Sequence, residues 1–465
     1  MSATPVQPPR APVGTLLIFA LGGLPTSALG AAMAIAVQPH MARDLGVSLT
    51  TVAAAFSIVR LLDLWVDPVM ALVMDRTRTP LGRYRAWLVG GAPILMLGVY
   101  QLFMAKKGIG LPFLIVWLFV YALGSSITVL SRQAWSATLV TRYGQRSLFY
   151  GLMASLGVIG TLVALATPVV LAKLGHGQSG ASDVPTMGWI ILGMIPVCVL
   201  LVSLLVPERV AIDAPTERVG LRDYWQIVKR PELLRLFVSS FSLTLGPGWM
   251  SNLYLFFFIA ARGFTNAQAY LLLLVYVVSG VIGAPLIGWA GARFSKHRTM
   301  IAATIGYSIG LCTVLLPPRG DVIATLPLMM WCGFMATGFE LTTSAMMADL
   351  GDQVRLEQGK ERMALLFATT GLSAKLASAG AVAMSYWLLS KIGFVATTGA
   401  HNSPAVLSAF NVVFLSGPIF FVTLGGLCFL GWKLDAGRHA LIRAQLEARD
   451  AMLDNPALGE LSPLN

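Results

Sequence analysis

Residues 187–206 read MGWIILGMIPVCVLLVSLLV, a run of twenty residues without a charged side chain. A helix of about twenty apolar residues is long enough to cross the hydrocarbon core of a bilayer. The whole chain has this character, because 56% of its 465 residues are hydrophobic and only 12% are charged. Soluble domains are about one quarter charged. A chain this apolar is therefore expected to expose its surface to lipid.

Eleven further runs resemble this one, so the sequence predicts an all-α membrane protein with twelve transmembrane helices. If the N-terminus is cytoplasmic, the cytoplasmic segments hold 23 of the 33 Lys and Arg residues and the opposite side holds 7. This bias predicts that both termini are cytoplasmic, and it explains the net charge of +12 without a nucleic-acid partner. The predicted spans are 14–39, 49–74, 86–104, 111–138, 148–172, 187–206, 234–260, 267–291, 299–317, 323–348, 363–390 and 406–432.

The longest polar stretch between spans divides the chain into two sets of six helices. Each half also carries a basic loop after its second helix, at 75–85 and at 291–298. Repeated halves of this kind are typical of transporters that move one half against the other around a midplane site. We predict two pseudo-symmetric bundles, at 1–206 and 234–432, with a cytoplasmic linker at 207–233 and a cytoplasmic tail at 433–465.

Six charged residues fall inside predicted spans. A charge at the centre of a membrane helix costs about 2.5–3.5 kcal/mol on insertion scales, so such residues are expected to pair or to face water. By default they mark a path for a substrate or an ion. The six residues, which sum to zero charge, are Arg60, Asp63, Asp67, Arg132, Glu340 and Lys375.

The first three of these residues are spaced i, i+3, i+7 and share one helix face. Two carboxylates one turn apart in a low dielectric do not both ionise readily, so one holds a proton, or a cation lies between them. This is what a coupling-ion site requires. The alternative for Asp63 is a permanent salt bridge, for example with Arg60. Glu340 alone can simply be neutral, and Arg132 can extend to the cytoplasmic surface.

The first span contains Gly22-Gly23-Leu24-Pro25-Thr26-Ser27, which predicts a helix break that exposes backbone groups to a cavity. Close packing of helices through small residues is the alternative interpretation. Tyr121 and Trp135 in the fourth span can stack on a sugar, although membrane aromatics often lie at the interface instead.

Three motifs resemble one known family. They are Asp63-Leu-Trp-Val-Asp67-Pro68, the loop from Asp75-Arg-Thr to Gly82-Arg-Tyr-Arg-Ala-Trp87, and Asp349-Leu-Gly-Asp352 with the following Gly359, Lys360 and Arg362. Together they are similar to the glycoside–pentoside–hexuronide:cation symporters, the melibiose permease group of the major facilitator superfamily. Lys375 stands where that family keeps a lysine in helix eleven.

The resemblance implies a cation-coupling site formed by Asp63, Asp67 and Thr128, with Lys375 close by. It also implies that Arg60 matches a family arginine and that Trp135 is a sugar-side aromatic. On this basis the substrate-binding residues are expected to be Arg60, Ser131, Arg132, Trp135, Glu340 and Thr26. The residues of the gating loops are expected to be Asp75, Arg76, Arg83, Asp349, Asp352 and Arg362.

The departures from the family are informative. Sodium-using members have an Asn before the second aspartate, where this chain has Val66, and this favours protons. Melibiose-type members have an acid at the place of Ser131 and another in helix one, where this chain reads Leu24-Pro25-Thr26-Ser27. Both acceptors for sugar hydroxyls are therefore absent. A galactoside is not expected, whereas a hexuronide with its carboxylate on Arg132 fits the added charge.

We therefore expect a secondary transporter that couples a small organic solute, such as a sugar, glycoside or uronide, to a cation. The coupling ion is expected to be H⁺, with Na⁺ as the alternative, and no other cofactor is expected. An amphipathic or lipid-like substrate is a second interpretation, and a non-transporting receptor or assembly factor is a third. The sequence shows no pairing of a nucleophile with a base that would support an enzyme. The Cys and His residues are scattered and do not have the spacing of a metal site. The expected location is a bacterial inner membrane, and the expected form is a monomer.

Overall fold

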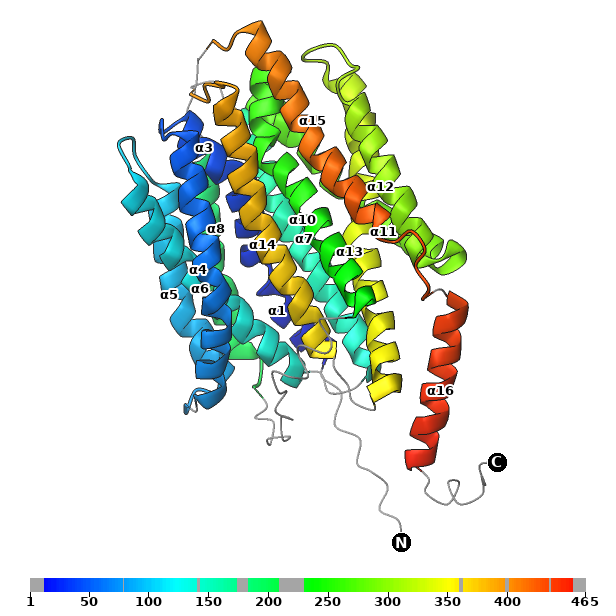
Figure 1. Ribbon diagram of the computed structural model, residues 1–465. Helices are drawn as coiled ribbons and strands as arrows, with labels where there is room; N and C mark the ends of the chain where they lie inside the picture. Colours follow the sequence, from blue (N-terminus) through cyan, green and yellow to red (C-terminus); the bar gives the residue numbers. More distant parts are fainter. Residues whose placement is uncertain are drawn as a thin grey trace. The chain divides into compact units, whose positions relative to one another are not determined.

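The computed structural model describes residues 12–77, 79–139, 143–173, 183–208, 230–358, 363–397, 401–434 and 436–454, and within these ranges every regular element is a helix (Figure 1). The helices of the first half are α1 (Val13–Leu21), α2 (Leu24–Ala32), η1 (Met33–Val37), α3 (Gln38–Arg43), α4 (Leu49–Arg76), α5 (Tyr84–Phe103), α6 (Leu111–Leu139), α7 (Tyr143–Lys173) and α8 (Val184–Leu205). The remaining helices are α10 (Pro231–Phe256), η3 (Phe257–Ala261), α11 (Asn266–Phe294), α12 (Lys296–Thr313), α13 (Val322–Gln358), α14 (Met363–Lys391), α15 (Pro404–Leu427) and α16 (Ala436–Asp454).

Each of the twelve predicted spans corresponds to one helix or one run of joined helices. The first span is α1 to α3 with η1, and the seventh is α10 with η3. Among the described residues, ten helical segments are long and apolar enough to cross a membrane by themselves. The two predicted spans outside this set are α12, which begins with Lys296-His297-Arg298, and α14. The sequence did not predict α16, which lies in the segment expected to be a tail.

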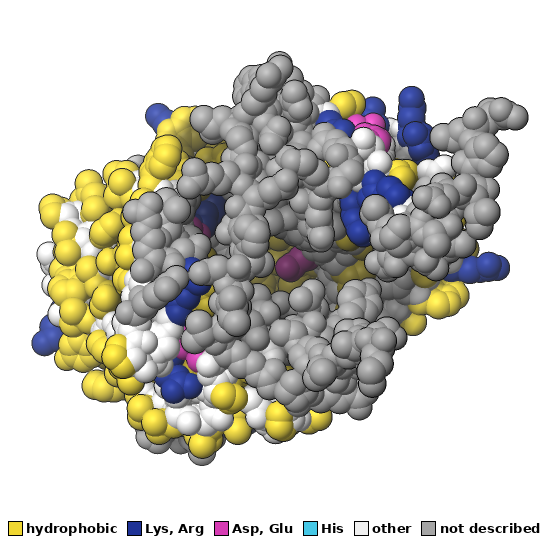
Figure 2. Space-filling model, turned by 90° about the horizontal axis from the view of Figure 1, so that it is seen from below, with side chains coloured by type: hydrophobic (Ala, Val, Ile, Leu, Met, Phe, Trp, Pro, Cys, Tyr) yellow, Lys and Arg dark blue, Asp and Glu magenta, His cyan; other side chains and the backbone are white. Residues whose placement is uncertain are grey.

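Large apolar side chains cover the outer faces of the helices. Leu204, Trp189 and Ile323 have 77%, 60% and 82% of their surface exposed. Exposed apolar surface of this extent marks contact with another apolar phase, which for helices of this length is the lipid bilayer. In Figure 2 hydrophobic side chains are prominent on the face seen from below, and Lys and Arg side chains lie there at several points.

The chain divides into two compact units. Unit 1 comprises Met1–Glu217, Gly248–Leu274 and Ser378–Phe414, and unit 2 comprises Arg218–Pro247, Val275–Ala377 and Leu415–Asn465. In unit 1, α5 packs along α6, and α2 packs along α7. In unit 2, α12 packs along α13, and α16 lies beside the end of α13 (Figure 1). The division crosses four helices, so the predicted bundles at 1–206 and 234–432 stay a prediction.

The first helix of each predicted half contains a π-helical turn. The continuous segments Val13–Arg43 and Pro231–Ala261 are both 31 residues long. In the first, the π turn η1 precedes the final turn α3, and in the second, the π turn η3 is the last turn. A π turn inside an α-helix is rare and frequently lies at a functional site.

The corner that follows each of these helices is also repeated. Gly46 and Gly263 both have φ of +74°, a conformation that glycine adopts without strain. The next helix then starts on a hydroxyl cap, Ser48 in one half and Thr265 in the other. The Ser48 oxygen accepts the Thr51 amide at 3.1 Å, and Thr265 forms a reciprocal capping box with Gln268. The repeat predicted from the basic loops therefore extends to this corner.

Candidate functional site

A cavity of about 170 Å³ lies in unit 1, and all of its lining residues belong to that unit. It is lined by residues of η1, α3, α4, α6, α10 and α14. Most of its wall is apolar. The polar residues of the wall are Gln38, Arg60, Asp63, Tyr121, Ser125, Ser126, Ser251, Asn252 and Ser378.

Two of the predicted coupling residues meet one serine. Asp63 is buried, with 6% of its surface exposed, and lies one turn before Asp67 on α4. The Ser126 hydroxyl on α6 lies 3.2 Å from Asp63 Oδ1 and 2.6 Å from Asp67 Oδ1. The prediction that the two aspartates share one helix face is therefore confirmed, and a hydroxyl on α6 bridges them.

The Thr128 hydroxyl contacts its own helix, and its part in the coupling site stays a prediction. Its hydroxyl donates to the carbonyls of Gly124 and Ser125 in its own helix, at 3.0 and 2.9 Å. Ser126 takes the place beside the aspartates instead. Residues two apart on a helix point to different faces, so α6 cannot present both hydroxyls to α4. Sequence reasoning missed Ser126, and its only signal was the run of small polar residues before Thr128.

Arg60 is exposed on the wall of the same cavity as Asp63, as expected for a charge that faces water. Lys375 lies in α14 within unit 2 and is partly buried. The approach of Lys375 to Asp63 or Asp67 stays a prediction.

The α-helix of the first span is interrupted at the predicted place by a tighter turn, but both glycines keep right-handed helical dihedrals, and the exposure of backbone groups to a cavity stays a prediction. α1 ends at Leu21 and α2 begins at Leu24, with Gly22 and Gly23 between them. Thr26 donates to the Gly23 carbonyl at 2.9 Å, and Arg132 Nη2 lies 3.4 Å from the Thr26 oxygen. A Cβ at Gly23 would collide with the Arg132 guanidinium, so the glycine leaves room for it. The structure thus brings together Thr26 and Arg132, although neither lines the cavity.

Three other expected substrate residues lie elsewhere. Trp135 is fully buried in an apolar cluster, edge-on to Phe19 with 5.5 Å between ring centroids, and the Arg85 guanidinium lies 5.5 Å from its ring. Ser131 is also fully buried and donates to a carbonyl of its own helix. Glu340 is exposed on α13 in unit 2. Trp135 and Ser131 thus pack in the core of unit 1 and do not line this cavity, and their role in binding a substrate stays a prediction.

Contacts within unit 1 join helices of the two predicted halves. Arg43 Nη1 donates to Asn266 Oδ1 at 2.8 Å, and Ser57 donates to the Ala379 carbonyl at 3.4 Å.

The Arg43 contact lies at helix ends that the sequence assigns to the outside, and a carboxylate supports it. Burial alone would raise the pKa of Asp44, but hydrogen bonds from His40 and Arg43 hold it well below its usual range. Asp44 therefore stays ionised and keeps Arg43 in place.

The predicted gating loop near Arg83 contains a carboxylate that sequence reasoning missed. Glu208 accepts the amides of Arg83, Tyr84 and Arg85 at 2.8, 2.7 and 3.1 Å. Amides at the start of a helix such as α5 have no partner within it, and the N-terminus of a helix attracts negative charge. Asp75 and Arg76 have no described side chain, and Arg362 lies outside the described residues.

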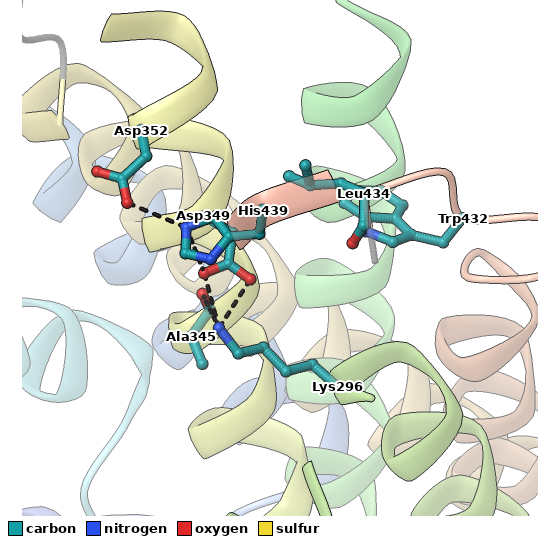
Figure 3. Close-up of polar contacts among 7 residues, drawn as sticks. All are labelled: Lys296, Ala345, Asp349, Asp352, Trp432, Leu434 and His439. Carbon is teal, nitrogen blue, oxygen red and sulfur yellow. Dashed lines mark hydrogen bonds and ion pairs between the residues drawn. The ribbon is translucent and has the colours of Figure 1, made fainter. Parts of the chain in front are cut away.

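The other predicted gating loop forms a charged cluster in unit 2 (Figure 3). Lys296 Nζ lies 2.6 Å from Asp349, and His439 lies 3.3 Å from Asp349 and 3.0 Å from Asp352. His439 belongs to α16, whose Ile442 and Leu446 are buried one turn apart. An apolar pair at i, i+4 was therefore the sequence signal for this helix. The cluster fixes α16 to the end of α13.

Comparison with known proteins agrees with this architecture. A family model described as "MFS/sugar transport protein" matches residues 18–436. The uncharacterized symporter YnaJ of Bacillus subtilis is 24% identical over 87% of this chain and 88% of its own length. The isoprimeverose transporter of Lactiplantibacillus pentosus is 21% identical over 87% and 85%. The mouse sphingosine-1-phosphate transporter MFSD2B is 22% identical over 90% and 89%.

The solved structure of a mutant of the nucleoside transporter NupG superposes with a TM-score of 0.66, covering 90% of this chain and 99% of its own, at 11% identity. This likeness shows the fold. The family match covers most of the chain, and it agrees with the twelve-helix architecture, the repeated corners and the aspartate pair on α4. The protein is therefore a membrane transporter and not an enzyme, and it belongs to the MFS/sugar transport protein family of the major facilitator superfamily, among the glycoside–pentoside–hexuronide symporters.

Proposed function

We propose that this protein is a proton-coupled symporter of a small sugar-like solute, in which Asp63 and Asp67 share the coupling proton through Ser126. The observation that carries the proposal is that one hydroxyl lies within hydrogen-bond distance of both carboxyl groups, at 3.2 and 2.6 Å. A serine hydroxyl has one proton to donate and two lone pairs that accept.

Counting the protons between these three groups supports this assignment. If both aspartates are ionised, Ser126 can donate fully to only one of them, and its contact with the other has no proton. If one carboxyl is protonated, it donates to Ser126 while Ser126 donates to the other carboxylate. The 2.6 Å contact is in the range of a charge-assisted bond to a carboxylate, and the 3.2 Å contact is longer. The singly protonated pair therefore satisfies both contacts of Ser126, as a coupling site must when it is loaded.

The alternative ion is sodium. A hard cation of this kind takes roughly five or six oxygen ligands. The contacts described above bring two carboxylates and Ser126 together, whereas Thr128 is turned away and Val66 offers no side-chain oxygen. A proton needs only one carboxylate, so this donor set favours H⁺. In this proposal Lys375 approaches the pair when the site releases its proton and replaces the lost positive charge.

The names of relatives support a sugar-like solute, since one is a symporter and another is an isoprimeverose transporter. A lipid-like substrate is the second candidate, because MFSD2B is a sphingosine-1-phosphate transporter. The cavity favours the first candidate. Its volume of about 170 Å³ is below the roughly 300–1,000 Å³ of sites for drug-sized ligands, and serines and amides lie along its wall.

The orientation belongs to the same proposal. The 23-to-7 distribution of basic residues supports cytoplasmic termini in a bacterial inner membrane. The protein is proposed to work as a monomer, since the cavity is formed within a single chain. A reporter fused to the C-terminus, active only on one side of the membrane, tests the orientation.

The test is uptake into proteoliposomes that contain the full chain. Labelled neutral sugars, uronides and lysolipids are offered with and without an imposed pH gradient. We expect a neutral sugar to accumulate only when the pH gradient is imposed and to leave the vesicles when a protonophore is added. Replacement of sodium by choline should not change its accumulation. Accumulation that follows a sodium gradient at fixed pH overturns the assignment of the ion, and accumulation of a lysolipid in place of a sugar overturns that of the solute.

A further inference from the structure

Two carboxamide side chains face the cavity from the first helices of the two predicted halves. Gln38 on α3 has 5% of its surface exposed, and Asn252 on α10 has 4%. Gln38 follows the π turn η1 directly, and Asn252 lies shortly before η3 begins. π turns locally change the direction in which side chains point, and they are frequent at functional sites. The two amides therefore come from the first helices of the two predicted halves, on opposite sides of their π turns, and lie on the wall of one cavity.

Each amide has a polar atom without a protein partner. Gln38 Oε1 and Asn252 Nδ2 are fully buried, and neither atom forms a hydrogen bond with any part of the chain that the structure describes. The backbone of Asn252 is held in place, because its carbonyl accepts the Tyr386 hydroxyl at 3.3 Å. Buried polar groups are nearly always hydrogen-bonded, so these atoms are expected to bind a group that enters the cavity.

The chemistry of the missing partner follows from these two atoms. One is an acceptor and the other a donor, and a hydroxyl group both donates and accepts. A sugar carries several hydroxyls around one ring, so it can donate to Gln38 and accept from Asn252 at the same time. Neither amide is charged. The charged residues of the wall are Arg60 and Asp63, one turn apart on α4, and their formal charges sum to zero, while Arg132 does not line the cavity. The site therefore fits a neutral polyhydroxylated solute better than a uronide or a phosphate.

The size of the cavity is consistent with one sugar unit. Its volume of about 170 Å³ is well below the roughly 300–1,000 Å³ of sites for drug-sized ligands. Asp63 and Ser126 lie on the α4 and α6 walls of the same cavity. Asp67 is not among the lining residues, so a solute held by the amides lies beside Asp63 and Ser126 and is linked to Asp67 through the Ser126 hydroxyl, 2.6 Å from Asp67 Oδ1.

We propose that Gln38 and Asn252 are the hydroxyl-binding residues of the transporter and that they select a neutral sugar, one ring of which enters the cavity. This inference rests on the proposed symport function, because it assigns the solute to the cavity that Asp63 and Ser126 line.

The experiment measures binding and transport separately. Neutral probes are xylose, lactose and isoprimeverose, and charged or amphipathic probes are glucuronate and lysophosphatidylcholine. The variants are Gln38→Met, which keeps the length of the side chain without its hydrogen bonds, and Asn252→Ala. Asn411→Ala is the matched control, since Asn411 Oδ1 is also buried without a partner among the described residues but does not line the cavity.

We expect a neutral probe to raise the melting temperature of the purified protein, and both cavity variants to raise its half-saturating concentration at least tenfold. In proteoliposomes the same variants should raise KM at least tenfold, while the number of protons moved per solute is unchanged. Asn411→Ala should behave like the parent protein.

The inference is overturned if both cavity variants bind the neutral probe and show a KM like the parent protein, or if Asn411→Ala loses as much affinity as they do. It is also overturned if only a charged or lipid probe raises the melting temperature. Binding without proton-driven uptake instead contradicts the proposed symport and leaves the hydroxyl-binding residues supported.

Discussion

Removal of the Ser126 hydroxyl is the sharpest test of the shared-proton site. Ser126→Ala deletes one oxygen that contacts both carboxyl groups, at 3.2 and 2.6 Å, and leaves the aspartates in place. A hydrogen bond to a charged group contributes about 1.5–3 kcal/mol. A change of 1.4 kcal/mol is a factor of ten in an equilibrium constant. Where the rate of proton-driven uptake is limited by how much of the site is loaded, the loss predicts a decrease of about 10- to 150-fold in that rate.

The assay compares two modes of transport in the same proteoliposomes. Proton-driven accumulation requires the site to load and unload, whereas exchange of labelled for unlabelled solute does not require net proton movement. We expect Ser126→Ala to lose accumulation and to keep exchange within about threefold, which is a change in free energy below roughly 0.7 kcal/mol. Ser126→Thr restores a hydroxyl and should recover most of the accumulation.

Ser131→Ala is the control for this experiment. Ser131 is a buried serine on the same helix, but its hydroxyl donates to a backbone carbonyl. If Ser126→Ala accumulates solute within about twofold of the parent protein, or if Ser131→Ala loses as much, the hydroxyl does not carry the shared proton. A parallel loss of exchange and accumulation would also refute the reasoning, because it would point to general damage to the helix.

Four other substitutions each test a single contact. Asp67→Asn should abolish proton-driven accumulation and keep exchange, and accumulation in this variant contradicts the role of the carboxylate. The 2.8 Å bond from Arg43 to Asn266 joins helix ends on the predicted outer side, and we predict that it restricts access to the cavity from there. Asn266→Leu should therefore increase labelling, from that side, of a cysteine placed in the cavity, and unchanged labelling contradicts this role. Glu208→Ala leaves three amides at the start of α5 without their acceptor and should lower stability by about 1–3 kcal/mol in thermal unfolding, with Glu208→Gln losing less. Gly23→Ala places a methyl group against a guanidinium and should reduce both folding yield and uptake, and a well-folded, active variant would show that the break tolerates a side chain.

The sequence predicted the helices well because each needs only its own apolar residues to be recognised. The helix break at Gly22 and Gly23 and the shared face of Asp63 and Asp67 are also local features, and both agree with the structure. Local periodicity is sufficient for such features, because a helix fixes which residues lie one turn apart.

The remainder of the site depends on how each helix is rotated, which no local pattern determines. Resemblance to a family suggested Thr128 and Trp135 on α6, but the rotation of this helix directs Thr128 to its own backbone and Trp135 to the core. Gln38 and Asn252 lie in different halves of the sequence, and their common cavity appears only in three dimensions. The α16 helix was missed for a different reason, since its apolar face is narrow and much of the rest is charged.

The π turns have an evolutionary consequence. A π turn accommodates one residue more than an α turn, so losing a single codon within 33–37 would convert η1 to an ordinary helix. The remainder of this helix, α3 with Gln38, would then rotate by about 100° about the helix axis, since 3.6 residues complete a turn. A comparable deletion within 257–261 would change the direction of the chain at the turn after the seventh span, while Asn252, which precedes the deletion, would keep its position. Descendants of this gene could therefore abandon one half of their sugar recognition in a single mutational step while inheriting the proton machinery on α4 and α6 unaltered.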